Sequence, residues 1–191
     1  MTKSVGNSGS GAAAATARAL SPLAQIEQTL SISATAELAC AELSKIFRVQ
    51  PAEIALMRVE KDVLNFLFPV ELKAAGFIPL SSSKAVAART ATTRKVELFN
   101  NFVIVQHANV FETIKLATLG QSDAPGANVI QKLMSTPIID PKHQVLGVVQ
   151  VCRKGTTQED AGSDFTLNDL QNLELAAKIL GKLPFMRAVA H

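Results

Sequence analysis

The 191-residue sequence contains no tryptophan and no tyrosine, and phenylalanine, with nine copies, supplies all of its large aromatic side chains. Proteins that bind single-stranded nucleic acid usually stack bases on aromatic rings, so this class has few residues available here. The 19 lysines and arginines nearly balance the 16 aspartates and glutamates, and a net charge of +3 does not indicate a general nucleic-acid surface. No uncharged apolar run approaches the roughly 18 residues that a membrane helix needs. We therefore expect neither nucleic acid nor a membrane as a partner.

Cysteine and histidine are too few and too scattered to predict a metal site. The two cysteines, Cys40 and Cys152, lie far apart in the chain, and neither belongs to a Cys-x-x-Cys motif or a Cys/His cluster. Lone thiols are typical of a reducing compartment, which predicts a cytoplasmic protein. The sequence also lacks paired catalytic carboxylates, an activated nucleophile and a phosphate-binding loop. We therefore predict no metal ligands and no catalytic residues.

The composition predicts one folded domain with extra termini. A hydrophobic content of 48% supports a real core. Residues 1–20 are small, polar and rich in Gly, Ser and Ala, and such a segment cannot bury enough apolar area to offset the entropy of ordering. We predict a disordered tail there; basic residues without an acid leave a transit peptide as the alternative, whereas the lack of an apolar run excludes a secretory signal. The domain should span residues 21–184, followed by a C-terminal tail at 185–191.

Hydrophobic spacing predicts an α+β domain with a mostly antiparallel sheet. Helical spacing marks the segment after Pro22 and the stripe from Ala36 to Phe47. Thr166 and Asp169 form a capping-box pattern at the start of the last helix. The other predicted elements are strands at Ile54–Glu60, Val63–Phe68, Val96–Phe102, Met134–Asp140 and Val145–Arg153, and helices at about Lys84–Ala91 and Asn109–Leu119.

The run Val145–Val151 is apolar on both faces of the predicted pleat, which is typical of a central strand covered on both sides. A regular strand would point Leu146 and Val148 one way, and Val145, Val149 and Val151 the other. Gly147 lies inside this run. We expect Gly147→Leu to destabilise the fold by overpacking, on the order of 1–3 kcal/mol.

Segments of this pattern resemble the GAF domain family. The hairpin of Leu133–Asp140 (LMSTPIID) and Val145–Val151 (VLGVVQV) is similar to the family's penultimate hairpin, with Gly147 at the position of the family's glycine. Phe165–Leu170 (FTLNDL) and the Leu-rich helix after it are similar to the family's closing helix. Upstream, Ser83–Asn101 resembles the short helix, turn and strand that precede the family's binding loop.

The resemblance implies a GAF-like (profilin-like) α+β fold with an antiparallel sheet of about six strands. It covers about Leu23 to Leu183, and the stretch Val103–Val129 is longer than the family's typical segment. Terminal helices would cover one face of the sheet, and pocket-forming loops and short helices the other. Such domains are usually sensors that bind cyclic nucleotides, tetrapyrroles, 2-oxoacids or other metabolites, and they usually dimerise through the terminal helices.

The family's ligand motifs are matched only in part. Lys154, Phe165 and Asp169 stand at three positions of the Asn-Lys…Phe…Asp-Glu pattern of cyclic-nucleotide GAF domains, but Arg153 replaces its Asn and Leu170 its Glu. In the family these residues mostly brace the fold, so the match favours the fold over that ligand. Bilin attachment commonly needs a Cys followed by His, and neither cysteine is followed by one. The ligand and any cofactor stay unknown.

We predict a small-molecule-binding sensor or regulatory module in signal transduction, with output in trans through a partner or as a homodimer, and not an enzyme. One alternative is a thiol-based redox enzyme of the free-methionine sulfoxide reductase type, which needs a nucleophilic thiolate and a resolving cysteine. Cys40 on a helix stripe and Cys152 on a central strand are more typical of buried, inert thiols. The other alternative is a dimerisation scaffold without a ligand.

The densest polar residues around the predicted binding loop form the candidate ligand site: Arg89, Asn100, Asn101, His107 and Glu112. Only one of Asn100 and Asn101 can face a pocket, because adjacent side chains on a strand point opposite ways. The hypothesis is that these groups surround an apolar cavity of roughly 300 Å³ or more. The alternative is that they are turn-forming amides, a surface ion pair and a capping or core histidine. His107 and Glu112 lack the third ligand that a metal site needs.

The terminal helices carry apolar residues outside the stripes expected to face the sheet. Leu23, Ile26 and Leu30 precede the sheet-packing stripe of the first helical region, and Leu175 and Ile179 lie off the stripe of the last helix. A lone domain offers nothing to cover them, so we predict a homodimer in which the terminal helices form a four-helix bundle. The alternative is that Leu23–Leu30 folds back over its own domain.

Overall fold

The computed structural model describes residues 22–74, 76–102 and 129–187 of the chain. These residues form a six-stranded antiparallel sheet with the strand order β3-β2-β1-β6-β5-β4. Its strands are β1 (Ile54–Glu60), β2 (Val63–Phe68), β3 (Phe77–Pro79), β4 (Glu97–Phe99), β5 (Val129–Ile139) and β6 (Val145–Gly155). The described helices are α1 (Pro22–Ser31), α2 (Ala36–Phe47), α3 (Val86–Thr93) and α5 (Leu167–Leu180), with short 3-10 helices η1 (Pro51–Glu53), η2 (Val70–Leu72) and η4 (Pro184–Met186). The predicted α+β class and the sheet of about six strands are confirmed.

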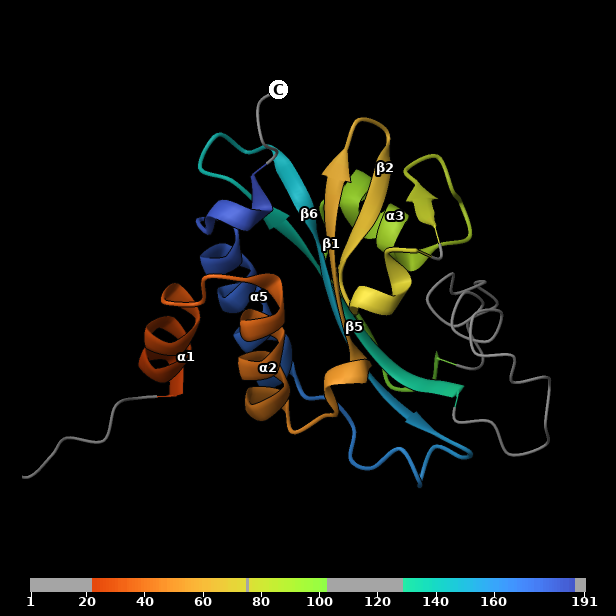
Figure 1. Ribbon diagram of the computed structural model, residues 1–191. Helices are drawn as coiled ribbons and strands as arrows, with labels where there is room; N and C mark the ends of the chain where they lie inside the picture. The colour runs from red at the N-terminus through yellow and green to blue at the C-terminus, as the bar shows by residue number, and fades with distance from the viewer. Residues whose placement is uncertain (1–21, 75, 103–128, 188–191) are drawn as a thin grey trace, which may run out of the picture.

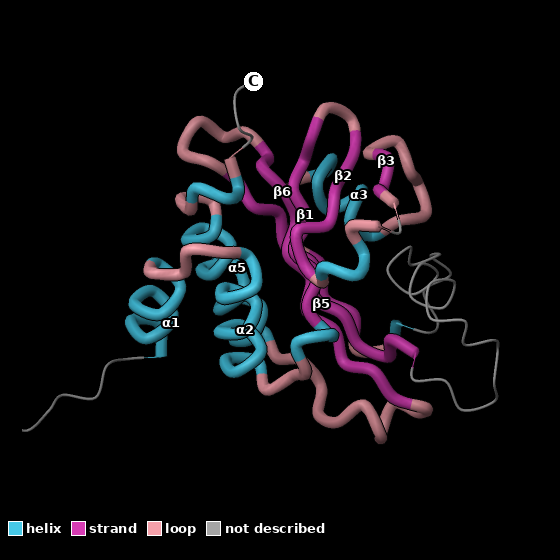
Figure 2. The backbone as a smooth tube through the Cα atoms, viewed as in Figure 1, coloured by secondary structure: helices cyan, strands magenta, loops and turns pink. Residues whose placement is uncertain are grey.

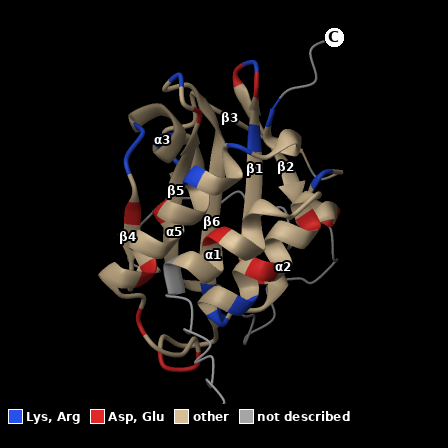
Figure 3. Ribbon diagram, turned by 90° about the vertical axis from the view of Figure 1, so that its left-hand side faces the viewer, with Lys and Arg blue, Asp and Glu red and all other residues tan. Residues whose placement is uncertain are grey.

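Helices cover both faces of this sheet (Figure 1). The first and last helices, α1, α2 and α5, lie together on one face and α3 lies on the other, as Figure 2 also shows. Figure 3 looks onto the layer of α1, α2 and α5, where acidic and basic residues are interspersed. The terminal helices therefore share one face, as expected. The helix predicted at Asn109–Leu119 and the tail predicted at residues 1–20 lie outside the described residues.

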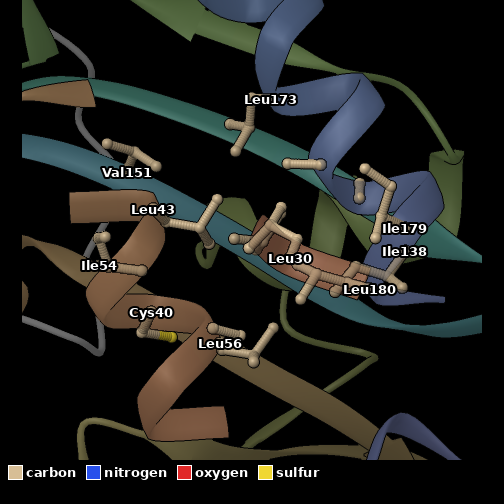
Figure 4. Packing of buried hydrophobic residues seen from close by; sticks show 14 of the residues in the cluster. Leu30, Cys40, Leu43, Ile54, Leu56, Ile138, Val151, Leu173, Ile179 and Leu180 are labelled. Carbon is tan, nitrogen blue, oxygen red and sulfur yellow. The ribbon is translucent and has the colours of Figure 1, made fainter. Parts of the chain in front are cut away.

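Each face of the sheet has its own apolar core. The helical-face core includes Leu30, Cys40, Leu43, Ile54, Leu56, Ile138, Val151, Leu173, Ile179 and Leu180 (Figure 4). The α3-face core includes Met57, Leu64, Phe66, Ala88, Leu133, Val148 and Cys152. The sheet thus separates two independent sets of packed side chains.

β6 is a central strand, as predicted from its two apolar faces, and it pairs with β1 on one side and β5 on the other. The predicted alternation along it is wrong at its first two residues. The pairing shifts between Ile138 and Ile139, which leaves one extra residue in β6 before Gly147. As a result Leu146 packs against the helical-face core and Val145 against the α3-face core, the reverse of a regular pleat.

Side-chain caps determine where α2 and α5 begin. Thr35 precedes α2, and its hydroxyl accepts a hydrogen bond from the Leu38 backbone N–H at 3.3 Å. Thr166 precedes α5, and its hydroxyl accepts the Asp169 N–H at 3.1 Å while the Asp169 carboxylate accepts the Thr166 N–H at 2.8 Å. The predicted capping box is therefore confirmed.

Most of the apolar groups expected to be uncovered on the terminal helices are buried within the chain, while the side chain of Leu23 lies outside the described residues. α1 packs against α5, and Ile26, Leu30 and Ile179 are 3%, 0% and 4% exposed in the helical-face core. Leu175 is partly buried against the same core. The first helix therefore folds back over its own domain, which was the alternative. The predicted homodimer loses the support of these residues, because they are already covered, and stays a prediction.

The folded domain extends past the predicted boundary at residue 184. Pro184–Met186 forms η4, and Met186 is fully buried in the helical-face core. The Arg58 guanidinium of β1 donates a hydrogen bond to the Phe185 carbonyl at 3.0 Å. The predicted C-terminal tail of 185–191 is wrong for Phe185 and Met186, since the short helix that begins at Pro184 packs both side chains against the helical-face core.

A buried hydroxyl in β5 allows a direct test of packing. The Thr136 side chain is 2% exposed, and the described residues offer its hydroxyl no hydrogen-bond partner. Burying an unpaired polar group costs about 1–3 kcal/mol, so Thr136→Val should raise the free energy of unfolding by about 1 kcal/mol in urea titrations. Thr136→Ala, which leaves a cavity, should lower it. A valine variant less stable than wild type would show that the hydroxyl is bonded in solution.

Candidate functional site

A line of hydrogen-bonded polar side chains crosses the α3 face of the sheet. α3 is short and rich in alanine, and its buried alanines bring it close to β5 and β6. Thr90 of α3 approaches Ser135 of β5, with 2.7 Å between the two hydroxyl oxygens. Gln150 of β6 lies opposite Ser135 in the strand pairing and donates its amide N–H to the Ser135 hydroxyl at 3.1 Å. Thr90 and Ser135 are 0% exposed and Gln150 is 3% exposed.

The line continues from these buried groups to an ion pair nearer the surface. Thr90 donates its hydroxyl to the Glu97 carboxylate at 3.3 Å, and Arg89 donates its Nε–H to the two carboxylate oxygens at 3.1 and 3.0 Å. The Arg89 and Glu97 side chains are 30% and 16% exposed. The Arg89 guanidinium also lies 6.0 Å from the centroid of the Phe99 ring. We call Arg89, Thr90, Glu97, Ser135 and Gln150 the α3-face network.

The hydrogen bonds of this network all lead toward the Glu97 carboxylate. Because Thr90 donates to Glu97, its oxygen must accept the proton of Ser135, and Ser135 in turn accepts from Gln150. A chain of hydrogen bonds that ends on a carboxylate is polarised along its length. The charges of Arg89 and Glu97 cancel, so the network offers hydrogen-bonding groups without a net charge.

The predicted site residues do not lie in one place in the structure. Arg89 belongs to the α3-face network. Asn100 does not join it: its amide N–H donates to the Phe165 carbonyl and its amide oxygen accepts the Phe165 N–H, both at 2.9 Å. Asn101 is exposed. His107 and Glu112 lie outside the described residues. The described part of the chain therefore does not bring Arg89 and Asn100 together, because their partners belong to opposite faces of the sheet.

Of the network residues, Arg89 alone was predicted from the sequence to belong to a site. Ser135 and Gln150 are polar residues inside two long, mostly apolar strands. A polar side chain within such a strand was the feature of the sequence that could have indicated a site. Strand periodicity does not reveal that they face each other. The partnership of Thr90 with Glu97 depends on where α3 lies relative to β4, which no local pattern encodes.

The partly matched family motif braces the fold, as expected. Phe165 is 2% exposed in the helical-face core, and the Arg153 guanidinium lies 4.7 Å from its ring centroid. Asp169 caps α5. The Lys154 backbone N–H donates to the Glu53 carboxylate at 2.7 Å. These contacts hold the loop before α5 and the start of β1 against β6.

Among the described residues, no helix is both long enough and apolar enough to cross a membrane. The same residues contain no group of three His, Cys, Asp or Glu side chains that could hold a metal ion.

No model of a known family and no curated protein sequence matches this chain. Solved structures do match its fold along most of its length. The GAF domain of a phosphoenolpyruvate-protein phosphotransferase from Acinetobacter is 11% identical, with a TM-score of 0.59 over 84% of this chain and 88% of that one. The chain has a GAF fold. The GAF domain of the phosphoenolpyruvate-protein phosphotransferase from Coxiella burnetii agrees, with 12% identity, a TM-score of 0.59 and the same coverages of 84% and 88%.

Structures with the GAF fold that match this chain also include an enzyme. The free methionine-R-sulfoxide reductase from Neisseria meningitidis, solved with its substrate, is 17% identical, with a TM-score of 0.55 over 84% of each chain. The structural similarity establishes the GAF fold, whereas sequence identities this low leave the activity open.

The two thiols of the chain are both buried, and they lie in different cores. Cys40 is 0% exposed in the helical-face core and Cys152 is 1% exposed in the α3-face core. Burial, with a smaller contribution from the charge of Glu37, raises the pKa of the Cys40 thiol well above its usual range. A thiol with a raised pKa stays protonated at neutral pH and is a poor nucleophile. The sheet between the two sulfurs also keeps either from resolving a reaction of the other.

Proposed function

We propose that this GAF domain is a regulatory module that binds a polar small molecule on the α3 face of its sheet and is not an enzyme. Its output passes in trans to a partner protein or through a homodimer, in the cytoplasm. The α3-face network would supply the ligand contacts, with the Arg89–Glu97 pair at its more exposed end.

The observation that carries this proposal is the burial of the network itself. Thr90, Ser135 and Gln150 lie almost fully covered in a face that is otherwise apolar. Replacing a buried polar network by apolar side chains of similar volume is often neutral or stabilising, so stability alone does not require it. A satisfied buried network can fix how α3 packs on the sheet, and it also supplies what a binding site needs, a few placed polar groups in an apolar surface.

The charge balance of the network suggests the class of ligand. Arg89 and Glu97 neutralise each other, so a strongly anionic or cationic ligand would meet no compensating charge from this group. An uncharged or zwitterionic molecule with several hydrogen-bonding groups fits better, because it can exchange bonds with both members of the pair.

The buried thiols favour a binding module over the redox alternative. A sulfoxide reductase would need an accessible thiolate and a resolving cysteine within reach. Cys40 and Cys152 are the only cysteines of the chain, and they are separated by the sheet.

Native mass spectrometry of protein purified from its own cells tests the proposal. Wild type should carry the added mass of a small molecule. Ser135→Ala should lose it, because the change breaks the link between Gln150 and Thr90. Thr136→Val is the matched control: it alters the next residue of the same strand, which belongs to no network, and should keep the added mass.

Two outcomes would contradict the proposal. Wild-type protein without any added mass would favour the scaffold without a ligand. An added mass that Ser135→Ala retains at full occupancy would place the ligand away from the α3-face network.

A further inference from the structure

The side chain of Asn100 joins the two faces of the molecule. It follows the last residue of β4, and it forms two hydrogen bonds of 2.9 Å with the backbone N–H and C=O of Phe165. Two bonds to one peptide segment fix its orientation as well as its distance, as in the pairing of two strands. β4 is therefore attached directly to the residue before the N-cap of α5.

The position of β4 depends in turn on the α3-face network. β4 is an edge strand that pairs with only three residues of β5, and one of those pairs is Glu97 with Ser135. Glu97 is held by Arg89 and Thr90 of α3. A change in this ion pair can shift β4 without breaking the rest of the sheet, because among the described strands β4 pairs with β5 alone.

The other end of the connection is the first turn of α5. Phe165 is buried in the helical-face core under the Arg153 guanidinium, so its backbone has little freedom to absorb a displacement. Thr166 comes next and accepts the N–H groups of Asp169 and Leu170, through its hydroxyl and its carbonyl, both at 3.1 Å. A displacement of Phe165 therefore reaches the hydrogen bonds that start the helix.

We propose that Asn100 is a coupling residue, which transmits rearrangement of the α3-face network to the N-terminus of α5. This inference deepens the proposed function and rests on it, because it gives the ligand face a route to the opposite helical layer. Asn100 itself contacts no ligand in this arrangement, since both ends of its amide are bonded to Phe165.

A double-mutant cycle tests the coupling without any ligand. Glu97→Gln removes the charge that Arg89 and Thr90 bind and so imitates a rearranged network. Hydrogen exchange by NMR reads the Asp169 and Leu170 amides. In the presence of Asn100, Glu97→Gln should speed their exchange about tenfold, within the range of coupling between contacting residues.

The Asn100→Ala background should remove this response, so that the two amides exchange equally fast with and without Glu97→Gln. Asn101→Ala is the matched control, because Asn101 is exposed and its loss should leave the response intact. Asn100→Asp keeps the bond from the Phe165 N–H and loses the other. The Asn100→Asp variant should therefore weaken the response to Glu97→Gln. It replaces Asn100→Ala in the cycle if the alanine variant does not fold.

An equal response to Glu97→Gln in the wild-type and Asn100→Ala backgrounds, or no response in the wild-type background, would overturn the inference and leave Asn100 with a structural role. The result is independent of ligand binding. If native mass spectrometry finds no ligand but the cycle shows coupling, the proposed function fails alone; a ligand without coupling removes only this inference.

Discussion

Gly147→Ala is expected to destabilise the protein by about 3 kcal/mol, although it adds a single methyl group. A Cβ atom at Gly147 would lie 2.0 Å from the Met57 carbonyl oxygen and 2.7 Å from the Met186 methyl carbon. Met57 belongs to β1, whose backbone cannot move away without disturbing its pairing with β6. Gly147→Leu should cost at least as much. Urea denaturation measures the loss as a lower midpoint.

Gly181→Ala is the matched control for this prediction. Its added Cβ would lie 2.8 Å from the Ile139 carbonyl oxygen, a milder clash, and Gly181 has a helical backbone that alanine favours. The alanine at 181 should therefore destabilise the protein much less than the alanine at 147. A Gly147→Ala variant with wild-type stability would show that β1 and β6 do not pair in this register.

Leu30→Ala is expected to cost about 3 kcal/mol of unfolding free energy, in the usual range for a buried leucine. The Leu30 side chain is fully buried in the helical-face core, where α1 packs against α5. Ile32 lies two residues further on and is 80% exposed, so Ile32→Ala should change stability little. Urea titrations of the two variants, side by side with wild type, measure the difference.

The same experiment distinguishes packing within the chain from packing between two chains. If α1 covers its own domain, the unfolding midpoint of wild type should be the same at low and high protein concentration. In a homodimer held by the terminal helices the midpoint would rise with concentration. If the midpoint depends on protein concentration in wild type but not in Leu30→Ala, the result would support the predicted four-helix bundle.

Periodicity in the sequence was enough to locate the main elements but not their details. The bounds predicted for β1 and β2 match the structure, because each is a mainly apolar run and the two flank a tight turn at Lys61 and Asp62. β3 was not predicted, since three residues that end in proline form a strand only through pairing with β2. The extra residue in β6 was equally hidden, because a bulge arises from the pairing with β5.

The candidate site was harder to predict, because its bonds join segments far apart in the chain. Arg89 was identified as a polar residue near the binding face, but its partner Glu97 belongs to a different element. Asn100 was predicted to be a ligand-binding residue, whereas both ends of its amide bind the backbone of Phe165, 65 residues further along the chain. Side-chain direction at the end of a three-residue edge strand cannot be inferred from alternation alone.

The separation of the two cores by the sheet has a consequence for how such a chain diversifies. Among the described residues, the α3-face core and the helical-face core form two separate packed clusters, so substitutions in one should combine additively with substitutions in the other. Side chains on the α3 face can therefore be substituted, in evolution or by design, while the layer of α1, α2 and α5 keeps its sequence. The exception is Asn100, whose replacement would be felt on both sides.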